Sequence, residues 1–187
     1  MLKQKTFAGN ALEETISLVQ SGPLIIDGCL FKILKLRVHG DVYVSGRKGY
    51  PCLNVQATCD GASRFTSVDI SFPGSVHDAR VYRESGLRKK LEQLGADQPY
   101  HVLANKAYSV DPQVMPAFKI NSRVPNATAF NVVHTRQRIM IKHIFGQVKR
   151  RFPGLGNVIR IKTQRIPDFT QSVLFSDDDD YDFEHDE

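Results

Sequence analysis

Residues 72–86 join an alternating apolar run to a basic segment of helical character. The Pro-Gly pair at 73–74 predicts a sharp turn between them, because Pro fixes φ and Gly accepts positive φ. Ser75 is then expected to cap the following helix, whose first turn would carry His77 and Asp78. A strand, a turn and a capped helix is the ordinary interpretation, but it does not explain why a His-Asp pair and two arginines cluster there.

Residues 24–33 form an apolar run that follows Pro23 and contains one acid, Asp27. Such a run is typical of a buried strand. An unpaired buried carboxylate is costly, so Asp27 would need a cation, a metal or hydrogen-bond donors. We therefore take Asp27 as a candidate functional residue, the alternative being an ordinary Asp in a turn at the end of the strand.

The remaining segments predict an α/β fold. Two further strands, over 53–59 and 65–72, are joined by Asp60-Gly61, a good hairpin signal. Three strands followed by alternating helices and strands indicate a mixed sheet flanked by helices. The other expected elements are a weak helix within 1–22, a basic loop over 35–50, a helix over 87–94 closed by Gly95, a short strand within 100–108 and a helix over about 128–151, capped by Asn126 or Thr128.

The helix predicted over 128–151 has an apolar face and a basic face. Its apolar face is expected to consist of Phe130, Val133, Met140, Ile141, Ile144 and Val148. A solvated charged face would be the ordinary explanation of the basic side, yet it contains no acid, which fits phosphate contacts better. The basic side holds Arg136, Arg138, Lys142, His143, Lys149, Arg150 and Arg151, of which all but Lys142 and His143 are our candidate DNA-binding residues.

Charge is distributed unevenly along the 187 residues. Eight of the 20 acids lie in residues 177–187, so the rest of the chain keeps 25 Lys and Arg against 12 acids. This excess of positive charge favours binding of a polyanionic partner, most commonly nucleic acid. The alternative is a basic surface that serves solubility only. No apolar run of 18 residues and no signal peptide is present, which argues against a membrane protein. Three cysteines without CxxC spacing indicate reduced thiols in an intracellular protein and no structural zinc site.

Several short motifs cover about residues 24–155 in a characteristic order. They are Ile26-Asp27-Gly28, Arg47–Tyr50 with Leu53–Ala57, Pro73–Asp78, and the run from His134 through Phe145-Gly146 to Pro153. With these motifs the chain resembles the Harbinger transposase-derived nucleases, which are DDE superfamily endonucleases. The resemblance implies an RNase H-like core, an α/β fold with a mixed sheet flanked by helices.

In that family three acids hold divalent metals, Mg²⁺ or Mn²⁺, which activate water and stabilise the leaving oxygen during cleavage of DNA. The resemblance places the first acid at Asp27, puts Asn105 where the second belongs and Lys142 where the third belongs. Asp78, like Asp60, is a further candidate metal ligand beside Asp27. With two of three acids replaced, the site is expected to be impaired, and a cation at Lys142 could pair with Asp27 in place of a metal.

Three functions remain open at this stage. The first is a DDE endonuclease domain with metal-dependent phosphodiester hydrolysis on DNA, impaired by the replaced acids. The alternative is a non-catalytic DNA-binding or adaptor protein domesticated from a transposase, and the third is a product without a selected role. The resemblance also implies a Myb-like partner protein and a location in nucleus and cytoplasm.

The expected organisation has four parts. Residues 1–23 form a short helical segment, 24–155 the endonuclease core, 156–176 a truncated C-terminal part of the core, and 177–187 a disordered acidic tail. The 26 residues before the first acid leave no room for the helical DNA-binding region with which family members usually begin.

Overall fold

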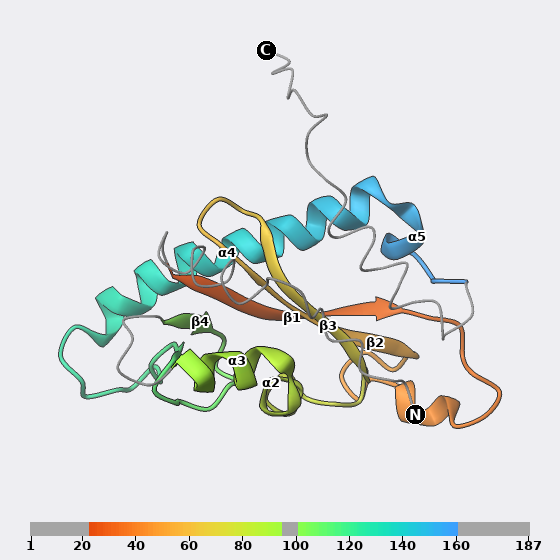
Figure 1. Ribbon diagram of the computed structural model, residues 1–187, viewed down its shortest axis with the longest axis horizontal. Coiled ribbons are helices and arrows are strands. Elements are labelled where there is room, and N and C mark those ends of the chain that lie inside the picture. Colours follow the sequence, from red (N-terminus) through yellow and green to blue (C-terminus); the bar gives the residue numbers. More distant parts are fainter. Residues whose placement is uncertain (1–22, 95–100, 161–187) are drawn as a thin grey trace, which may run out of the picture.

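A computed structural model describes residues 23–94 and 101–160 and contains a five-stranded mixed sheet with helices on both faces (Figure 1). The strands lie in the order β3-β2-β1-β4-β5. This arrangement confirms the predicted α/β, RNase H-like fold, whereas the predicted N-terminal helix and acidic tail fall outside the described residues. The strands are β1 (Leu24–Lys32), β2 (Cys52–Cys59), β3 (Phe65–Pro73), β4 (Val102–Ala104) and β5 (Val114–Pro116).

The strand β1 is the centre of the sheet. It pairs antiparallel with β2 on one side and parallel with β4 on the other, and β5 continues the parallel part. The strands β2 and β3 form the predicted hairpin, in which Asp60 accepts hydrogen bonds from the backbone N–H groups of Ala62 and Arg64 at 3.0 and 2.9 Å. Asp60 therefore belongs to the turn, where it also pairs with the Arg64 guanidinium at 2.9 Å.

The two faces of β1 bury side chains in separate cores, because successive residues of a strand point to opposite faces. Ile25 and Phe31 belong to one core, which is shared with α4 (Ala127–Arg151) and α5 (Pro153–Gly156). Leu24 and Ile26 belong to the other, shared with α2 (Asp78–Glu84) and α3 (Gly86–Leu94). Figure 1 shows the long helix α4 on one side of the sheet and the pair α2 and α3 on the other.

The sharp turn after β3 is present, but the predicted cap is wrong. The Gly74 N–H donates to the Cys52 carbonyl at 2.8 Å, and a Cβ at position 74 would overlap the Cys52 sulfur, so the turn requires Gly. Ser75 does not cap the helix: its hydroxyl donates to the carbonyl of Val42, 2.6 Å away, which belongs to the 3₁₀ helix η1 (Gly40–Tyr43). Helix α2 begins later, at Asp78, without a side-chain cap.

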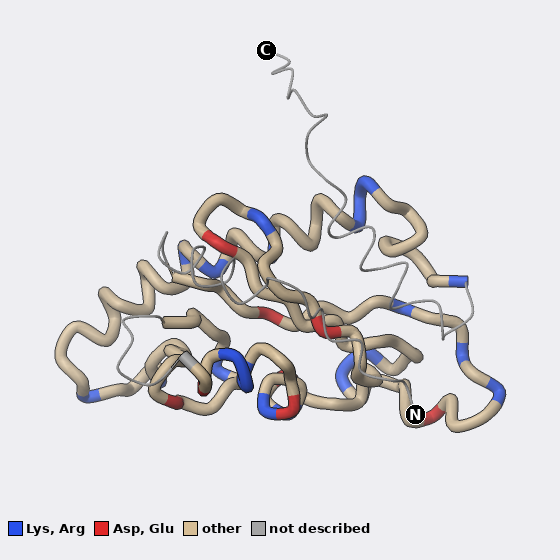
Figure 2. Tube along the Cα trace, viewed as in Figure 1, with Lys and Arg blue, Asp and Glu red and all other residues tan. Residues whose placement is uncertain are grey.

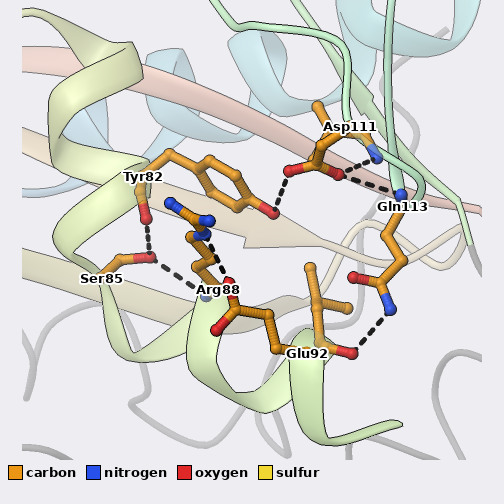
Figure 3. A network of polar contacts seen from close by, with 8 residues as sticks. Tyr82, Ser85, Arg88, Glu92, Asp111 and Gln113 are labelled. Atoms are coloured by element: carbon orange, nitrogen blue, oxygen red, sulfur yellow. Dashed lines mark hydrogen bonds and ion pairs between the residues drawn. The ribbon is translucent and has the colours of Figure 1, made fainter. Parts of the chain in front are cut away.

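Polar contacts hold α2 and α3 against the loop that leads into β5 (Figure 3). The Tyr82 hydroxyl donates to Asp111, and Gln113 donates from its amide to the Leu91 carbonyl at 2.6 Å. Between the two helices, the Ser85 hydroxyl donates to the Tyr82 carbonyl at 2.7 Å. This network fixes the layer formed by α2 and α3, and α2 begins at Asp78, one of the predicted metal ligands.

Helix α4 begins and ends close to the predicted bounds, but its inward face differs from the predicted one. Val133 is 55% exposed, whereas His134 is buried and donates from Nε2 to the Met115 carbonyl at 3.0 Å. One turn earlier, Asn131 exchanges hydrogen bonds with the backbone of Phe118 at 2.9 and 3.1 Å. The N-terminal half of α4 thus contacts the sheet edge through polar side chains. Asn126 precedes the helix with a positive φ and no side-chain cap, so that predicted cap is also wrong.

Candidate active site

Asp27 lies in the middle of β1 and points toward α4. Its Oδ2 accepts a hydrogen bond from Arg138 Nη2 at 3.0 Å, which makes an ion pair. Its Oδ1 accepts from Asn105 Nδ2 at 3.0 Å and from the Gly28 N–H at 3.1 Å. The side chains of Asp27 and Arg138 are only 10% and 13% exposed, so the charge of this carboxylate is matched by donors within the protein.

Asn105 follows β4, the parallel neighbour of β1, and this pairing brings it beside Asp27. Its own amide oxygen accepts from the Ala107 N–H at 2.6 Å. The amide is therefore held with its nitrogen toward the carboxylate and its oxygen toward the backbone. In this orientation Asn105 supplies a donor to Asp27 and no ligand for a metal.

The cation that pairs with Asp27 is Arg138, not Lys142 as the sequence suggested. Lys142 is exposed, because the buried side chains of Ile141 and Phe145 define the inward face of α4 at that level. Arg138, one turn earlier, lies on the inward side and reaches the central strand. Its placement also removes it from the exposed basic face on which we predicted DNA contacts.

Asp78 lies on the other side of β1. Its carboxylate accepts from Asn54 Nδ2 at 2.8 Å and sits against Gly28, where a Cβ would come within 2.8 Å of the Asp78 Cγ. Gly28 and Asp27 are consecutive in the strand, so they face opposite sides of the sheet. The structure therefore gives Asp27 and Asp78 separate hydrogen-bond partners.

Two polar residues of β2 that the sequence analysis did not single out hold Asp78 in place. Asn54 also donates to the Val76 carbonyl at 2.9 Å, and Gln56 donates to the Asp78 carbonyl at 3.1 Å and the Tyr108 hydroxyl at 2.9 Å. Burial raises the pKa of Tyr108, which keeps its hydroxyl neutral. Asn54 and Gln56 alternate with apolar residues along the buried strand β2, and this pattern was the signal that could have identified them.

These residues do not fit a two-metal centre. Among the residues that the structure describes, no group of three His, Cys, Asp or Glu side chains could hold a metal ion. The buried Nε of Arg138 has no hydrogen-bond partner, but it is a donor and cannot ligate a cation. Cys29 lies two residues along β1, and burial raises the pKa of its thiol, so it is a poor metal ligand as well.

The candidate DNA-binding residues of α4 fall into two groups. Arg136, Arg150 and Arg151 are exposed along the helix and its C-terminal end. Lys149 is half-buried: its Nζ donates to the Leu30 carbonyl at 3.0 Å and lies 4.7 Å from the centre of the Phe31 ring. Lys149 and Arg138 thus link α4 to the central strand, and the other three arginines lie at exposed positions of the helix, whose Lys and Arg positions are coloured blue in Figure 2.

The central strand carries an acid, and the adjacent parallel strand ends in a polar residue that contacts it. The mixed sheet with helices on both faces (Figure 1), which carries this acid on its central strand, defines an RNase H-like domain. The sequence model of the family described as "DDE superfamily endonuclease" matches residues 26–175, most of the chain. The chain belongs to this family, whose members generally use divalent metals.

Two curated relatives match the same part of the chain. "Putative nuclease HARBI1" from Bos taurus is 24% identical over 131 residues, and the protein of the same name from Homo sapiens has the same identity over the same length. The matched region covers 70% of this chain but only 37% of each relative. No solved structure matches. These similarities confirm the predicted relationship to the Harbinger transposase-derived nucleases.

Proposed function

We propose that this chain is a transposase-derived DDE endonuclease domain that binds DNA and whose phosphodiester hydrolysis is impaired. The observation that carries this proposal is the ion pair of Arg138 with Asp27, 3.0 Å apart and almost entirely buried. In the family the corresponding acid is expected to bind a divalent metal. Here a guanidinium from the same domain occupies one oxygen of that acid and an amide occupies the other.

Electrostatics oppose a metal at this site. A divalent ion bound to Asp27 would lie within a few ångströms of the Arg138 charge, in a region where little water screens the repulsion. Displacing the guanidinium would leave it buried without its partner, which is unfavourable by several kcal/mol. Asn105 and Lys142 stand where the resemblance expects acids. Neither provides a negative charge that would offset the repulsion between metal and guanidinium or the cost of leaving Arg138 unpaired.

Charge supports the DNA-binding half of the proposal. Helix α4 contains no acid, and Arg136, Lys142 and Arg150 are exposed along it. Lys and Arg side chains that contact phosphates release counterions, so binding of this kind weakens steeply with salt. DNA is also the substrate class that the family implies.

A cleavage assay tests the proposal. Supercoiled plasmid is incubated with Mn²⁺ and the full chain, beside the Asp27→Ala variant prepared in the same way, while binding of a short duplex is followed by fluorescence anisotropy. We expect salt-dependent binding and no nicking above that of Asp27→Ala. Mn²⁺-dependent nicking that Asp27→Ala abolishes would instead establish the second candidate function, an active nuclease, which the family match favours.

The partner and the location remain proposals that follow from the family resemblance. We propose a Myb-like partner protein and a distribution between nucleus and cytoplasm. Within the described ranges, none of the helices has the length and apolar character needed to cross a bilayer. Microscopy of the tagged chain, with and without a co-expressed Myb-like protein, tests both: location that does not respond to the partner would count against the pairing.

A further inference from the structure

We propose that the main phosphate-binding surface of this domain includes the end of the sheet where β1 leaves it, away from the acid centre. We call this surface the basic end and define it as residues 32–50 and 149–160. The inference rests on the proposed binding of DNA and adds where the duplex lies. None of the residues in 32–50 was among the candidate DNA-binding residues.

Backbone contacts place the two segments of the basic end side by side, although residues 51–148 lie between them in the sequence. Ile33 and Ile159 form a parallel bridge, and the Ile159 N–H donates to the Lys32 carbonyl at 2.8 Å. Lys149, which belongs to α4, donates from Nζ to the Leu30 carbonyl at 3.0 Å. The surface is therefore a fixed part of the fold, built around the last residues of β1.

The basic end carries nine Lys and Arg residues and a single acid, Asp41. That acid is already paired with Lys35 at 2.8 Å. Figure 2 shows basic positions spread over the half of the molecule that contains the end of β1 and α5, on both sides of the sheet. Of these side chains Arg37, Arg47, Lys48, Arg150 and Arg160 are exposed. A surface with this excess of exposed cations is complementary to a phosphate backbone.

Two of these cations lie at the tip of a tight loop between Val44 and Pro51, which form an antiparallel bridge. The Ser45 carbonyl accepts the N–H groups of Lys48 and Gly49 at 3.2 and 2.7 Å, and Gly49 has a φ of 71°, which favours glycine. Neither Arg47 nor Lys48 forms an ion pair with another described residue. A closed loop that presents two exposed cations lowers the entropy lost on binding.

The basic end lies at a distance from the acid centre but continues the exposed face of α4. Lys32 follows Asp27 by five residues in β1, a separation of about 16 Å at the rise of a strand. Arg150 connects the basic end with Arg136 along the same helix. A duplex on this surface would be held by sequence-independent phosphate contacts, and Asp27 would have no part in its affinity.

The test compares two triple variants that remove the same charge. The first, Arg37→Gln/Arg47→Gln/Lys48→Gln, neutralises the basic end. The matched control, Arg83→Gln/Lys89→Gln/Lys119→Gln, neutralises exposed residues of α2, α3 and the loop before α4. Duplex affinity is measured by anisotropy in the full chain over a range of salt concentrations, with the melting temperature of each variant as a check on folding.

We expect the basic-end triple to weaken binding at least about tenfold and to lower the salt slope by about 2 to 3, since each lost phosphate contact removes about 0.9. The control should change affinity less than about twofold. A second variant, Arg150→Gln/Arg160→Gln, samples the same surface from the other segment and is expected to act in the same direction if the first triple folds poorly.

Three results would overturn the inference. Equal losses in both triples would mean that only net charge matters. A second such result is unchanged duplex affinity in the basic-end variants together with weaker binding by Arg136→Gln/Lys142→Gln. It would confine DNA to α4 and keep the proposed function, and the basic end would then bind another anion, such as the acidic residues 177–187. No binding by the unmodified chain at any salt concentration would overturn the proposed function itself.

Discussion

Arg138 Nη2 lies 3.0 Å from Asp27 Oδ2 and joins the long helix to the central strand of the sheet. The two residues are 111 positions apart in the chain, and both side chains are almost fully withdrawn from solvent. A buried carboxylate requires a compensating partner, and in this domain the partner is a guanidinium. The pair is therefore a structural contact at the place where the family resemblance expects a metal ligand.

The ion pair should show strong energetic coupling. Asp27→Ala and Arg138→Ala each leave a buried charge unpaired, so we expect each to lower the free energy of unfolding by about 3 kcal/mol. The double variant should lose about 1 to 3 kcal/mol less than the sum of the two. Urea unfolding measures all three, with exposed Arg136→Ala as a control that changes stability by less than about 0.5 kcal/mol. Strict additivity would contradict the pairing.

Gly28 is required by the close approach of Asp78 to the central strand. A Cβ at this position would overlap the Asp78 carboxylate and lie 3.0 Å from Asn54 Oδ1, so Gly28→Ala must displace the hydrogen bond between half-buried Asp78 and Asn54. We expect a loss of about 1 to 3 kcal/mol in urea unfolding. Gly46→Ala, where a Cβ meets no atom within 4 Å, is the matched control and should change stability far less. Equal effects would mean that the contact with Asp78 does not constrain the strand.

His134 should make stability depend on pH. Burial, and to a lesser degree Arg138, lowers the pKa of His134 in the folded protein, so its imidazole stays neutral there. Below the ordinary pKa of about 6.5 the unfolded chain takes up a proton that the folded chain does not, so stability falls as pH falls toward the lowered folded value. His134→Gln should flatten this part of the profile, whereas exposed His143→Gln should not. Parallel profiles for His134→Gln and the unmodified chain would contradict the account.

The acidic residues 177–187 are expected to compete with DNA for the basic surface. They carry eight acids and no Lys or Arg, so a chain ending at residue 176 should bind a duplex more tightly, with the difference largest at low salt. Anisotropy titrations of the two chains at two salt concentrations measure this. Identical affinities would mean that these residues do not reach the DNA-binding surface.

The sheet could be predicted from the sequence because its signals are local. The apolar run around Asp27 and the Asp60-Gly61 turn between alternating strands specify β1 and the hairpin without reference to distant residues. The need of Asp27 for a compensating partner was also evident from its burial in such a run. The identity of that partner was not, since Arg138 and Asn105 meet Asp27 only in the folded domain.

The inward face of α4 could not be predicted for the same reason. Periodicity assigns apolar side chains to the core, so it placed Val133 inside and Arg138 outside. In the structure, His134 and Arg138 are buried because Met115 and Asp27, far away in the sequence, satisfy their polar groups. Farther along the helix, where Ile141 and Ile144 are buried, the periodicity was a reliable guide.

The measurement that tests the account most directly is Mn²⁺ binding followed by electron paramagnetic resonance. The full chain is compared with Asp27→Ala and with Asn105→Asp/Arg138→Glu, in which two acids join Asp27 and the shorter Glu leaves room for metal–oxygen bonds of about 2.1 Å. We predict that the unmodified chain and Asp27→Ala bind the same amount of Mn²⁺. The double variant Asn105→Asp/Arg138→Glu should bind more than either. Stoichiometric binding by the unmodified chain that Asp27→Ala abolishes would contradict the claim that Arg138 and Asn105 have replaced the metal.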